Sequence, residues 1–572
     1  MKTVENLVNH ILETEVLVIG GGSAGCYAAI GASLRGVKVL MVDKGKVGYS
    51  GCSPFAAGAI NVCLPEDNHE DWFEEIVTRG EYLNDQTWVK IQLDEGWQRV
   101  NEIREWGKKY GQKVLEEDAN GRIVRRKARG NINTLTAIIH ARPMMDTLRK
   151  KVIESGVQLL ERIMVTHLFK YQGQIVGALG LHCRTAEIYL IKARSVVLAA
   201  GGCGFKSLFI GHNNLTGEAQ YMAYRAGATL RNLDQAMSNS TSRDADIHGL
   251  SLMVGSGGRF LNGQGEEFMF RYDPKVGSRA RLTKLVIGMA KEVEAGRGPI
   301  YLDLTKVGPD DQQMLRKVLP EGFRAFERMG VDPFGQALEW VPAFEGTLVH
   351  GGGIHIDTNC ASNVPGLFSA GDTTCTPEHG TWSLTGLNLT FCFVSGYQAG
   401  LASAEYSKKA VPIPPGWGEL ESQITENVAE LLAPLRRPLN ITSDQIVYHI
   451  LAVLIPYRVA YLRNETRLCD ALNKIITLNR EEIPQVSARD PHELVKAFEV
   501  RSMGAIAEMI LRSVLFRQES RGFVYREDYP LTDNVNWLKW VMLGRNEQGI
   551  RVWSESFPTP YFDPPREKYI PR

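Results

Sequence analysis

A glycine-rich segment near the N-terminus has the residue types and the spacing that bind a pyrophosphate. Gly20, Gly22 and Gly25 follow a GxGxxG pattern directly after the apolar run 16–19. The first glycine allows a tight turn, the second lets a phosphate approach the backbone, and the third lets a helix pack on the strand. A helix that starts here turns its N-terminal N–H groups toward the phosphates. We therefore expect residues 20–25 to bind a dinucleotide.

The surrounding residues predict the elements that must position this turn. A second apolar run, 37–42, ends at Asp43, which is placed to accept a hydrogen bond from a ribose hydroxyl. Two later apolar runs also end in glycine-rich turns, at 196–204 and at 366–372. Three such signals predict a single Rossmann-like domain whose segments are far apart in the sequence.

Composition narrows the class of protein. The 572 residues carry 65 Lys and Arg and 65 Asp and Glu, so nothing indicates a nucleic-acid partner or a polybasic membrane anchor. No secretory signal and no apolar stretch of transmembrane length is visible, which predicts a cytoplasmic protein that could join a membrane through partner subunits. The nine cysteines are scattered without CxxC spacing. We expect no metal and no iron–sulfur cluster in this chain, although Cys52 and Cys375 could be either redox thiols or inert packing.

Several segments together resemble a known family. The turns at 20–25, 196–202 and 366–372 resemble the three FAD-contacting segments of the fumarate reductase/succinate dehydrogenase flavoprotein superfamily. Further matches are Ala59–Asn61 beneath the flavin, 261–272 and 296–303 in the cap, and 519–538 near the C-terminus. The resemblance implies FAD, a capping domain and two-electron chemistry at the flavin.

The implied architecture is α/β: a discontinuous Rossmann-like FAD-binding domain, an inserted α+β capping domain and a C-terminal helical domain. We expect the FAD-binding domain at 1–245 and 346–410, the cap at 246–345, the helical domain at 418–545 and an extended tail at 546–572. By the resemblance, the cofactor would be held by Gly20, Gly22, Ser23, Ala24, Gly25, Asp43, Lys44, Ser50, Gly51, Gly58, Ala59, Ala200, Gly201, Gly202, Gly371, Asp372, Ser383 and Leu384.

Departures from the family pattern bear on the substrate. Succinate dehydrogenases carry a histidine covalently bound to FAD, and Ser50-Gly51-Cys52-Ser53 occupies that stretch, so we expect non-covalent FAD. Ser251–Val254 replaces the Glu-x-x-Arg proton relay, and Ser383 replaces an arginine that binds a substrate carboxylate. Two carboxylates need cationic partners, so these losses argue against fumarate or succinate.

Candidate catalytic residues follow from the chemistry of reducing an activated double bond, which needs a proton donor and a group that stabilises an enolate. In the family that this chain resembles, the proton donor is an arginine in the cap, and by that resemblance Arg279 and Arg281 are the candidates here. The local Ser-Arg pattern favours the first, and spacing to Gly296 favours the second. His350, beside a glycine run, and His379, after Asp372, could contact substrate or flavin. The remaining candidates, for substrate binding, are Asn61, Asn239 and Trp382.

These residues indicate the catalytic FAD subunit of an oxidoreductase that reduces an activated C=C in an organic acid or thioester other than fumarate. Electrons would arrive from a separate iron–sulfur subunit. An alternative is the α-subunit branch of adenylylsulfate reductase, with sulfite chemistry through a flavin N5 adduct, since His379 follows Asp372 at a similar spacing there. A classical fumarate reductase or succinate dehydrogenase and a non-catalytic electron-transfer flavoprotein also stay open.

Overall fold

In the computed structural model, a mostly parallel sheet contains the strands that precede the three glycine-rich turns. The structure describes residues 4–56, 58–128, 131–209, 211–247, 249–382, 384–410 and 417–571. The strand order is β6-β2-β1-β9-β8-β7, and β16 pairs with β9. These strands span His10–Ile19 (β1), Val39–Asp43 (β2), Gln158–Glu161 (β6), Ile163–Tyr171 (β7), Gln174–His182 (β8), Ile188–Leu198 (β9) and Leu367–Ser369 (β16). β6, β2, β1, β9 and β16 pair in parallel, whereas β8 runs antiparallel to both β9 and β7.

The sheet register brings the three glycine-rich turns together. Ile19 pairs with Leu198, and Leu198 pairs with Ser369, so β1, β9 and β16 end at one level. Parallel strands present their carboxyl ends at the same edge of a sheet, where ligands of open α/β folds bind. The three segments that carry these turns therefore share one sheet, although they are far apart in the sequence.

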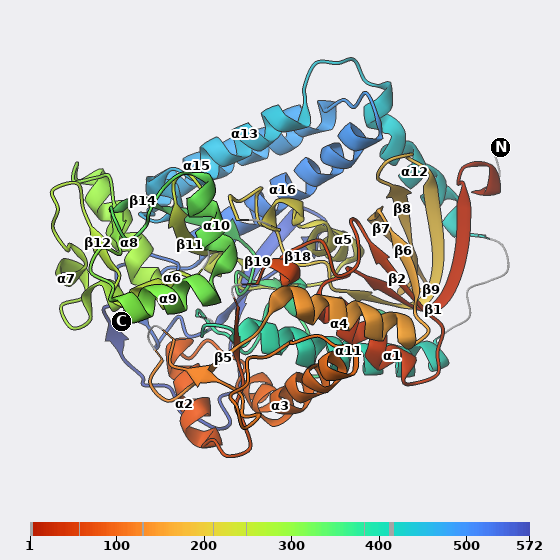
Figure 1. Cartoon of the computed structure of the whole chain (residues 1–572). Coiled ribbons are helices and arrows are strands. Elements are labelled where there is room, and N and C mark those ends of the chain that lie inside the picture. Colours follow the sequence, from red (N-terminus) through yellow and green to blue (C-terminus); the bar gives the residue numbers. More distant parts are fainter. Residues whose placement is uncertain are drawn as a thin grey trace.

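Four helices lie along one side of the sheet in Figure 1: α1, α3, α4 and α11. They span Ser23–Ser33, Gln86–Lys109, Ala141–Glu154 and Leu387–Lys409. α1 and α11 pack at backbone contact distance, because a Cβ added to Gly396 or Gly400 would lie 2.3 Å from the Ala24 carbonyl oxygen or 2.1 Å from that of Ala28. α2 (His69–Arg79) precedes α3, and a small sheet joins β3 (Ala59–Asn61), β4 (Arg125–Arg126) and β5 (Thr136–Ile138).

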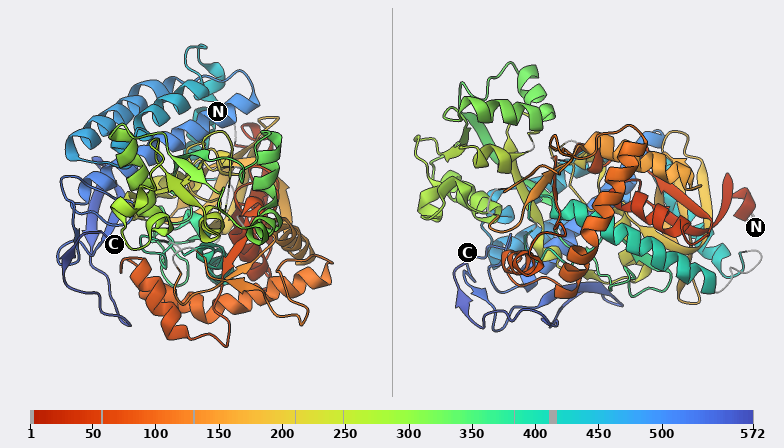
Figure 2. Two further views of the ribbon diagram at one scale, coloured as in Figure 1. Left: turned by 60° about the vertical axis from the view of Figure 1, so that its left-hand side comes forward. Right: turned by 60° about the horizontal axis from the view of Figure 1, so that its bottom comes forward.

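The inserted cap projects from the rest of the molecule, as the right-hand view of Figure 2 shows for the green segment. Its sheet has the order β11-β14-β13-β12, and its helices surround a separate core that includes Phe260, Leu285 and Trp340. The elements are β11 (Met237–Ser242), α6 (Leu250–Gly255), β12 (Arg259–Leu261), α7 (Met269–Tyr272), η5 (Gly277–Arg279), α8 (Leu282–Glu294), β13 (Tyr301–Asp303), α9 (Pro309–Val318), α10 (Pro320–Arg328) and β14 (Leu338–Gly346).

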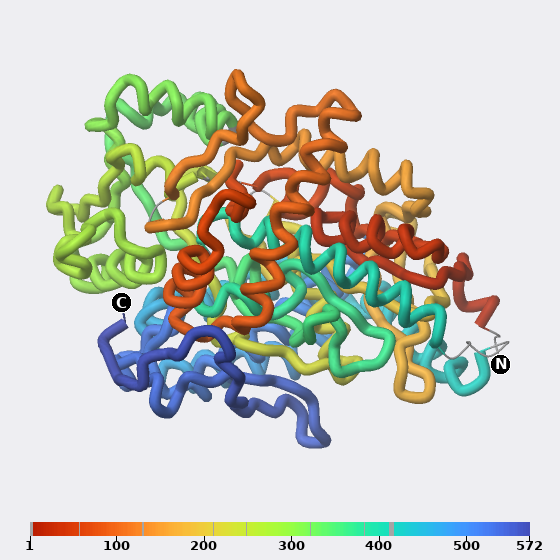
Figure 3. Tube along the Cα trace, turned by 90° about the horizontal axis from the view of Figure 1, so that it is seen from below, coloured from red at the N-terminus to blue at the C-terminus, as the bar shows by residue number. Residues whose placement is uncertain are grey.

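Helices dominate the next segment, and a hairpin follows them. The helices are α12 (Leu420–Leu432), α13 (Ser443–Leu454), α14 (Tyr457–Ala460), α15 (Glu465–Thr477) and α16 (Pro491–Phe516). The strands β18 (Trp540–Asn546) and β19 (Gly549–Glu555) then pair with each other, and β18 joins β10 (Leu230–Arg231), which also pairs with β15 (Gly353–Ile354). Figure 1 shows α12 close to the N-terminus, whereas in Figure 3 the last, darkest blue part of the chain lies beside the cap, away from the N-terminus. The hairpin crosses the boundary that we expected at 545/546, because β18 and β19 form one sheet with β10 and β15.

Two short strands, helix α5 and several short helical turns connect the elements given above. The other strands are β17 (Thr532–Asp533) and β20 (Lys568–Tyr569), and α5 spans Glu218–Ala226. Short 3₁₀ or π turns are η1 (Val4–Asn6), η2 (Ser53–Phe55), η3 (His212–Asn214), η4 (Leu233–Gln235), η6 (Gly371–Thr373), η7 (Ala433–Arg436), η8 (Leu478–Glu482) and η9 (Ile483–Gln485). In the described residues, no helix is long and apolar enough to cross a membrane.

Candidate active site

A cavity of about 540 Å³ opens at the carboxyl ends of β1, β2, β9 and β16 and continues to the cap. Such a volume is typical of sites that enclose a small molecule or cofactor. Of the predicted site residues, Gly20, Gly22, Ser23, Ala24, Asp43, Lys44, Ser50, Gly51, Ala59, Ala200, Gly201, Asn239, His350, Asp372, Trp382 and Leu384 line it. Gly25, Gly58, Asn61, Gly202, Arg279, Arg281, Gly371 and His379 do not line it, and Ser383 lies outside the described residues.

The N-terminal turn has the geometry that a pyrophosphate needs. Gly20 adopts φ +114°, and a Cβ there would lie 2.2 Å from the Ala199 carbonyl oxygen. A Cβ on Gly25 would lie 1.9 Å from the Gly20 carbonyl oxygen, so only glycine lets α1 begin this close to β1. The N-terminus of α1 borders the cavity through Ser23 and Ala24. These residues fit a bound dinucleotide.

Asp43 borders the cavity and also organises the turn. Its Oδ2 accepts a hydrogen bond from the Gly21 N–H at 2.7 Å, and its Oδ1 accepts from the Gly45 N–H at 2.7 Å and from the Ser50 hydroxyl at 3.0 Å. A carboxylate has about four acceptor sites, so Asp43 can hold these donors and still accept from a ribose hydroxyl. Ser50 supports Asp43 as well as lining the cavity.

Lys44 lies in a buried charge cluster at the same end of the cavity. Its Nζ is 2.7 Å from Glu218 Oε1 and 2.9 Å from Glu499 Oε1, and Lys206 contacts the other oxygen of Glu499. Burial alone would lower the pKa of Lys44, but the two carboxylates outweigh it and raise that pKa. Glu499 belongs to α16, so the C-terminal helical region supplies part of the cavity wall.

Asp372, which follows β16, is hydrogen-bonded to two other segments that line the cavity. Its Oδ2 accepts from the Val349 N–H at 3.2 Å and its Oδ1 accepts from the Asn388 side chain at 2.9 Å. All three residues line the cavity. Two N–H groups, together with the Cys392 thiol at 3.8 Å, therefore fix the Asp372 carboxylate in the cavity wall.

Cys52, His212 and Glu345 form a polar row in the cavity wall. His212 Nδ1 lies 3.0 Å from Glu345 Oε1, and the imidazole hydrogen-bonds to the Cys52 thiol. Burial opposes the protonation of His212, but Cys52 and Glu345 outweigh it and hold its pKa well above its ordinary value. Burial raises the pKa of Cys52 despite His212. The contacts of His212 therefore favour its charged form in the cavity wall.

His350 is the one of the two predicted histidines that lines the cavity. It is 3% exposed, and neither ring nitrogen has a hydrogen-bond partner among the described residues. Burial, and then His379, hold the pKa of His350 well below its ordinary value, so the ring is neutral. His379 lies behind it, with ring centroids 6.1 Å apart, and its Nε2 is 2.9 Å from Glu378 Oε1. A neutral imidazole can donate to a substrate carbonyl without adding charge.

Aromatic rings hold His350 in place. Phe523 stacks on it with centroids 5.3 Å apart, and Trp382 lies 6.3 Å from it. Trp382 also lines the cavity, as does Asn239, whose Oδ1 accepts from the Ser240 N–H at 2.9 Å. Asn61 is buried away from the cavity lining, and its side-chain amide has no hydrogen bond within the described part of the chain.

The two predicted arginines take different positions. Arg279 is exposed and donates to the Gly255 carbonyl at 2.9 Å on the cap surface. Arg281 precedes α8, and the next residue, Leu282, lines the cavity. Its side chain is 17% exposed and its Nη1 lies 3.7 Å from Glu81 Oε1. Arg281 is therefore the one of the pair that lies at the boundary between cap and core.

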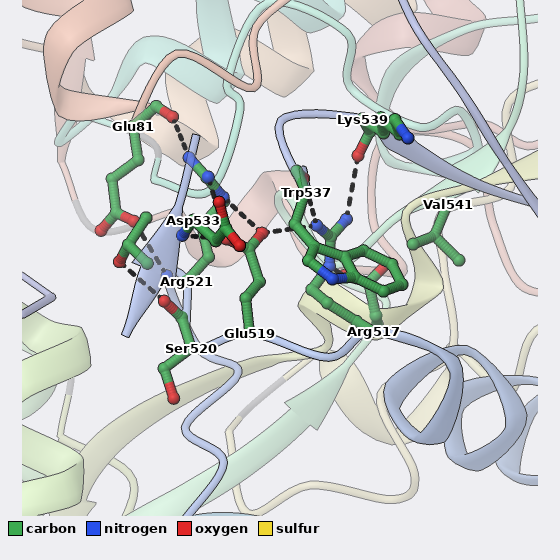
Figure 4. Close-up of polar contacts among 12 residues, drawn as sticks. Glu81, Arg517, Glu519, Ser520, Arg521, Asp533, Trp537, Lys539 and Val541 are labelled. Atoms are coloured by element: carbon green, nitrogen blue, oxygen red, sulfur yellow. Dashed lines mark hydrogen bonds and ion pairs between the residues drawn. The ribbon is translucent and has the colours of Figure 1, made fainter. Parts of the chain in front are cut away.

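Glu81 connects this boundary to a fully buried ion network in the C-terminal region, drawn in Figure 4. Its carboxylate accepts from the Gly522 N–H at 3.2 Å, and its carbonyl accepts from Arg521 at 2.7 Å. Arg521 and Arg517 share Glu519, at 2.7 Å and 2.8 Å. Burial raises the pKa of Glu81, although Arg281 and Arg521 oppose the rise.

Two family models match this chain, and together they include most of the residues that line the cavity. The model described as "FAD binding domain" matches residues 15–389, and the model described as "Fumarate reductase flavoprotein C-term" matches residues 451–569. The chain belongs to the fumarate reductase/succinate dehydrogenase flavoprotein family, and it is an FAD-dependent oxidoreductase.

Individual relatives extend over nearly the whole chain. A fumarate reductase (CoM/CoB) subunit of Methanothermobacter marburgensis is 28% identical, over 94% of this chain and 98% of its own length. The fumarate reductase flavoprotein subunit of Mycobacterium tuberculosis is 26% identical, over 94% and 96%. A solved structure of E. coli quinol fumarate reductase has a TM-score of 0.88 at 21% identity, covering 97% and 99%, and adenylylsulfate reductase of Archaeoglobus fulgidus has 0.80 at 21%, covering 98% of both chains. These two structures show the fold.

Sequence reasoning missed several cavity residues. Glu499 is far along the chain from Lys44, and His212 with Glu345 was not singled out. The sequence signal for Glu499 is that it is an acid at helical spacing on an otherwise apolar helix face within residues 494–503. No local signal marks Glu81, since only the fold brings it to Arg281. In the described residues, no group of three His, Cys, Asp or Glu side chains is placed to hold a metal ion.

Proposed function

We propose that this chain is the catalytic FAD subunit of an enzyme that reduces an activated C=C in an organic acid or thioester other than fumarate. The observation that carries the proposal is the neutral, unpartnered His350 in the cavity wall, a statement made of the described residues. A carbonyl conjugated to the double bond would accept from His350, which would stabilise the developing enolate. When bound, FAD supplies the hydride.

The roles of the surrounding residues follow from their positions. The turn at 20–25 and Asp43 would hold the dinucleotide, non-covalently, with Asp372 at the cap side. Trp382 would cover a planar substrate and help to exclude water. Arg281, rather than the exposed Arg279, would give the proton at the substrate carbon; its partly buried side chain, 3.7 Å from Glu81, supports this choice. Electrons would come from a separate iron–sulfur subunit.

The test uses chemically reduced holoprotein mixed anaerobically with crotonate, cinnamate, crotonyl thioester and fumarate. We expect rapid return of the oxidised flavin spectrum with at least one enoate or enoyl thioester and slow return with fumarate. Reoxidation by none of the four would refute the proposal. A His350→Ala variant should keep its flavin and lose about 10²–10³-fold in the reoxidation rate, as for removal of an oxyanion donor.

Sulfite chemistry of the adenylylsulfate reductase type is the second candidate. Its support is the whole-chain likeness in fold and the position of His379, directly behind His350. Sulfite added to oxidised holoprotein would then bleach the flavin tightly, whereas a C=C reductase of the proposed kind would respond weakly.

A further inference from the structure

Acids outnumber lysines and arginines among the described residues that line the cavity. The acidic lining residues are Asp43, Glu218, Glu345, Asp372 and Glu499, and the basic ones are Lys44, His212, His350 and His492. Lys44 is held by Glu218 and Glu499 at 2.7 Å and 2.9 Å. His212 lies 3.0 Å from Glu345. The positive charges of Lys44 and His212 are therefore matched by acids of the wall itself.

A carboxylate lies beside His350, the residue proposed to donate to the substrate carbonyl. Asp372 accepts from the Val349 N–H at 3.2 Å, and Val349 directly precedes His350 in the chain. The other donors to this carboxylate are the Asn388 amide and the Cys392 thiol, at 2.9 Å and 3.8 Å. All three donors are uncharged, so they leave the negative charge of Asp372 in place.

The cap side of the cavity is apolar. Met237, Leu250 and Leu282 line the cavity and belong to the buried core of the cap, and Trp382 packs against the same cluster. Burial keeps the pKa of His350 low, so its ring meets a ligand as a neutral donor. Burying an ionised carboxylate against such a wall costs far more than burying a carbonyl that accepts one hydrogen bond.

The arginine assigned to the substrate carbon has its own acid. Arg281 lies 3.7 Å from Glu81, which matches its positive charge at the boundary between cap and core. A ligand carbonyl at His350 therefore meets a neutral imidazole, an apolar wall and the Asp372 anion. Like charges brought together in this way discriminate between ligands of different charge.

We propose that the substrate of this site is an uncharged carbonyl compound, an enoyl thioester or an enone, and that a free carboxylate is disfavoured beside His350. The inference rests on the proposed function in taking an activated C=C as the reacting group. It narrows the substrate from an organic acid or thioester to the uncharged class. His350 donates to the carbonyl oxygen, while Asp372 and the apolar cap wall oppose an anionic acyl group.

The experiment compares two ligands that differ in charge and hardly in shape. Cinnamamide and cinnamate are titrated separately into oxidised holoprotein, which cannot reduce them, by calorimetry with the visible flavin spectrum as a second readout. We expect saturable binding of both at low ionic strength, with cinnamamide about 10–100-fold tighter.

Salt gives an independent measurement on the unmodified protein. Raising the ionic strength from about 0.01 M to about 1 M shortens the Debye length from about 30 Å to about 3 Å. Repulsion of cinnamate is then partly screened, so its affinity should rise several-fold while that of cinnamamide stays within about twofold.

Two variants separate the charge of Asp372 from the donor role of His350. Asp372→Asn with normal flavin content should bind cinnamate several-fold more tightly and leave cinnamamide unchanged, which loss of structure would not produce. His350→Ala should weaken cinnamamide about 5–10-fold, the loss of one hydrogen bond. The matched control is Glu339→Gln, an acid paired with Arg243 at the cap surface, which should leave both affinities unchanged.

Four results would overturn the proposal: no saturable binding of cinnamamide, cinnamate binding as tightly as cinnamamide, a gap that salt does not narrow, or an unchanged gap in flavin-replete Asp372→Asn. Reoxidation of the reduced protein by crotonate and not by the crotonyl thioester would also overturn it, although the proposed reaction would then stand. Failure of every enoate and thioester would instead refute the proposed reaction, and the amide preference of the oxidised protein would still report on this part of the cavity.

Discussion

Replacing Gly25 by alanine tests the idea that the start of α1 is the cofactor's phosphate site. The new Cβ would lie 1.9 Å from the Gly20 carbonyl oxygen, and it would contact the Ala199 side chain at 3.5 Å. Since ordinary contacts begin well above 3 Å, the helix must retreat from the turn by more than 1 Å. Overpacking of this kind costs about 1–3 kcal/mol.

That displacement acts on the N–H groups that face the pyrophosphate, so we expect it to appear mainly as lost FAD affinity. A loss of about 1.4–2.8 kcal/mol corresponds to about 10–100-fold in Kd. The assay titrates apoprotein with FAD and follows the quenching of flavin fluorescence. Gly308→Ala is the control, because a Cβ there meets nothing within 4 Å.

The prediction is refuted by an FAD Kd in Gly25→Ala within about twofold of the parent, since α1 would then tolerate the displacement without moving its N–H groups. Equal losses of FAD affinity in Gly25→Ala and Gly308→Ala would also refute it, because the effect would not depend on the close approach of helix and turn.

Two further predictions concern buried charges. Glu519→Gln should lower the free energy of unfolding by about 3–5 kcal/mol, because it leaves Arg517 and Arg521 without their shared carboxylate; urea unfolding measures this, and a change below about 1 kcal/mol contradicts it. Cys52 and Glu345 raise the pKa of His212 in the folded state, so the stability from these two contacts is fully present below the unfolded pKa of about 6.5 and is lost as pH rises through the folded pKa. His212→Asn should remove that component of the pH dependence of thermal unfolding, and an unchanged profile would contradict this.

Local patterns were enough to predict the elements around the cofactor. Residues 16–43 consist of an apolar run, a glycine-rich turn and a second apolar run. The elements that form there, β1, α1 and β2, contact each other over short sequence distances, so the pattern predicts them. The same holds for β9 and β16. Exact boundaries, such as the start of α11 at Leu387, are not given by these patterns, because helix ends depend on capping and packing.

Local sequence patterns did not predict the C-terminal hairpin of β18 and β19. Residues 546–572 are polar and aromatic, which predicts an extended tail, but 549–555 form β19 because β18 is already paired with β10. The partner of β18 is β10, which is far away in the sequence, so the composition of residues 540–555 only weakly predicts that they form strands.

The sequence by itself determined the Gly20–Gly25 turn, the acid at Asp43 and the family, since each depends on residue type and short spacing. Only the tertiary structure decided that Arg281 faces Glu81 while Arg279 faces solvent, and that Glu499 reaches Lys44. The physical reason is that a side chain's pKa and partners are set by burial and by charges within a few ångströms, whatever their distance along the chain.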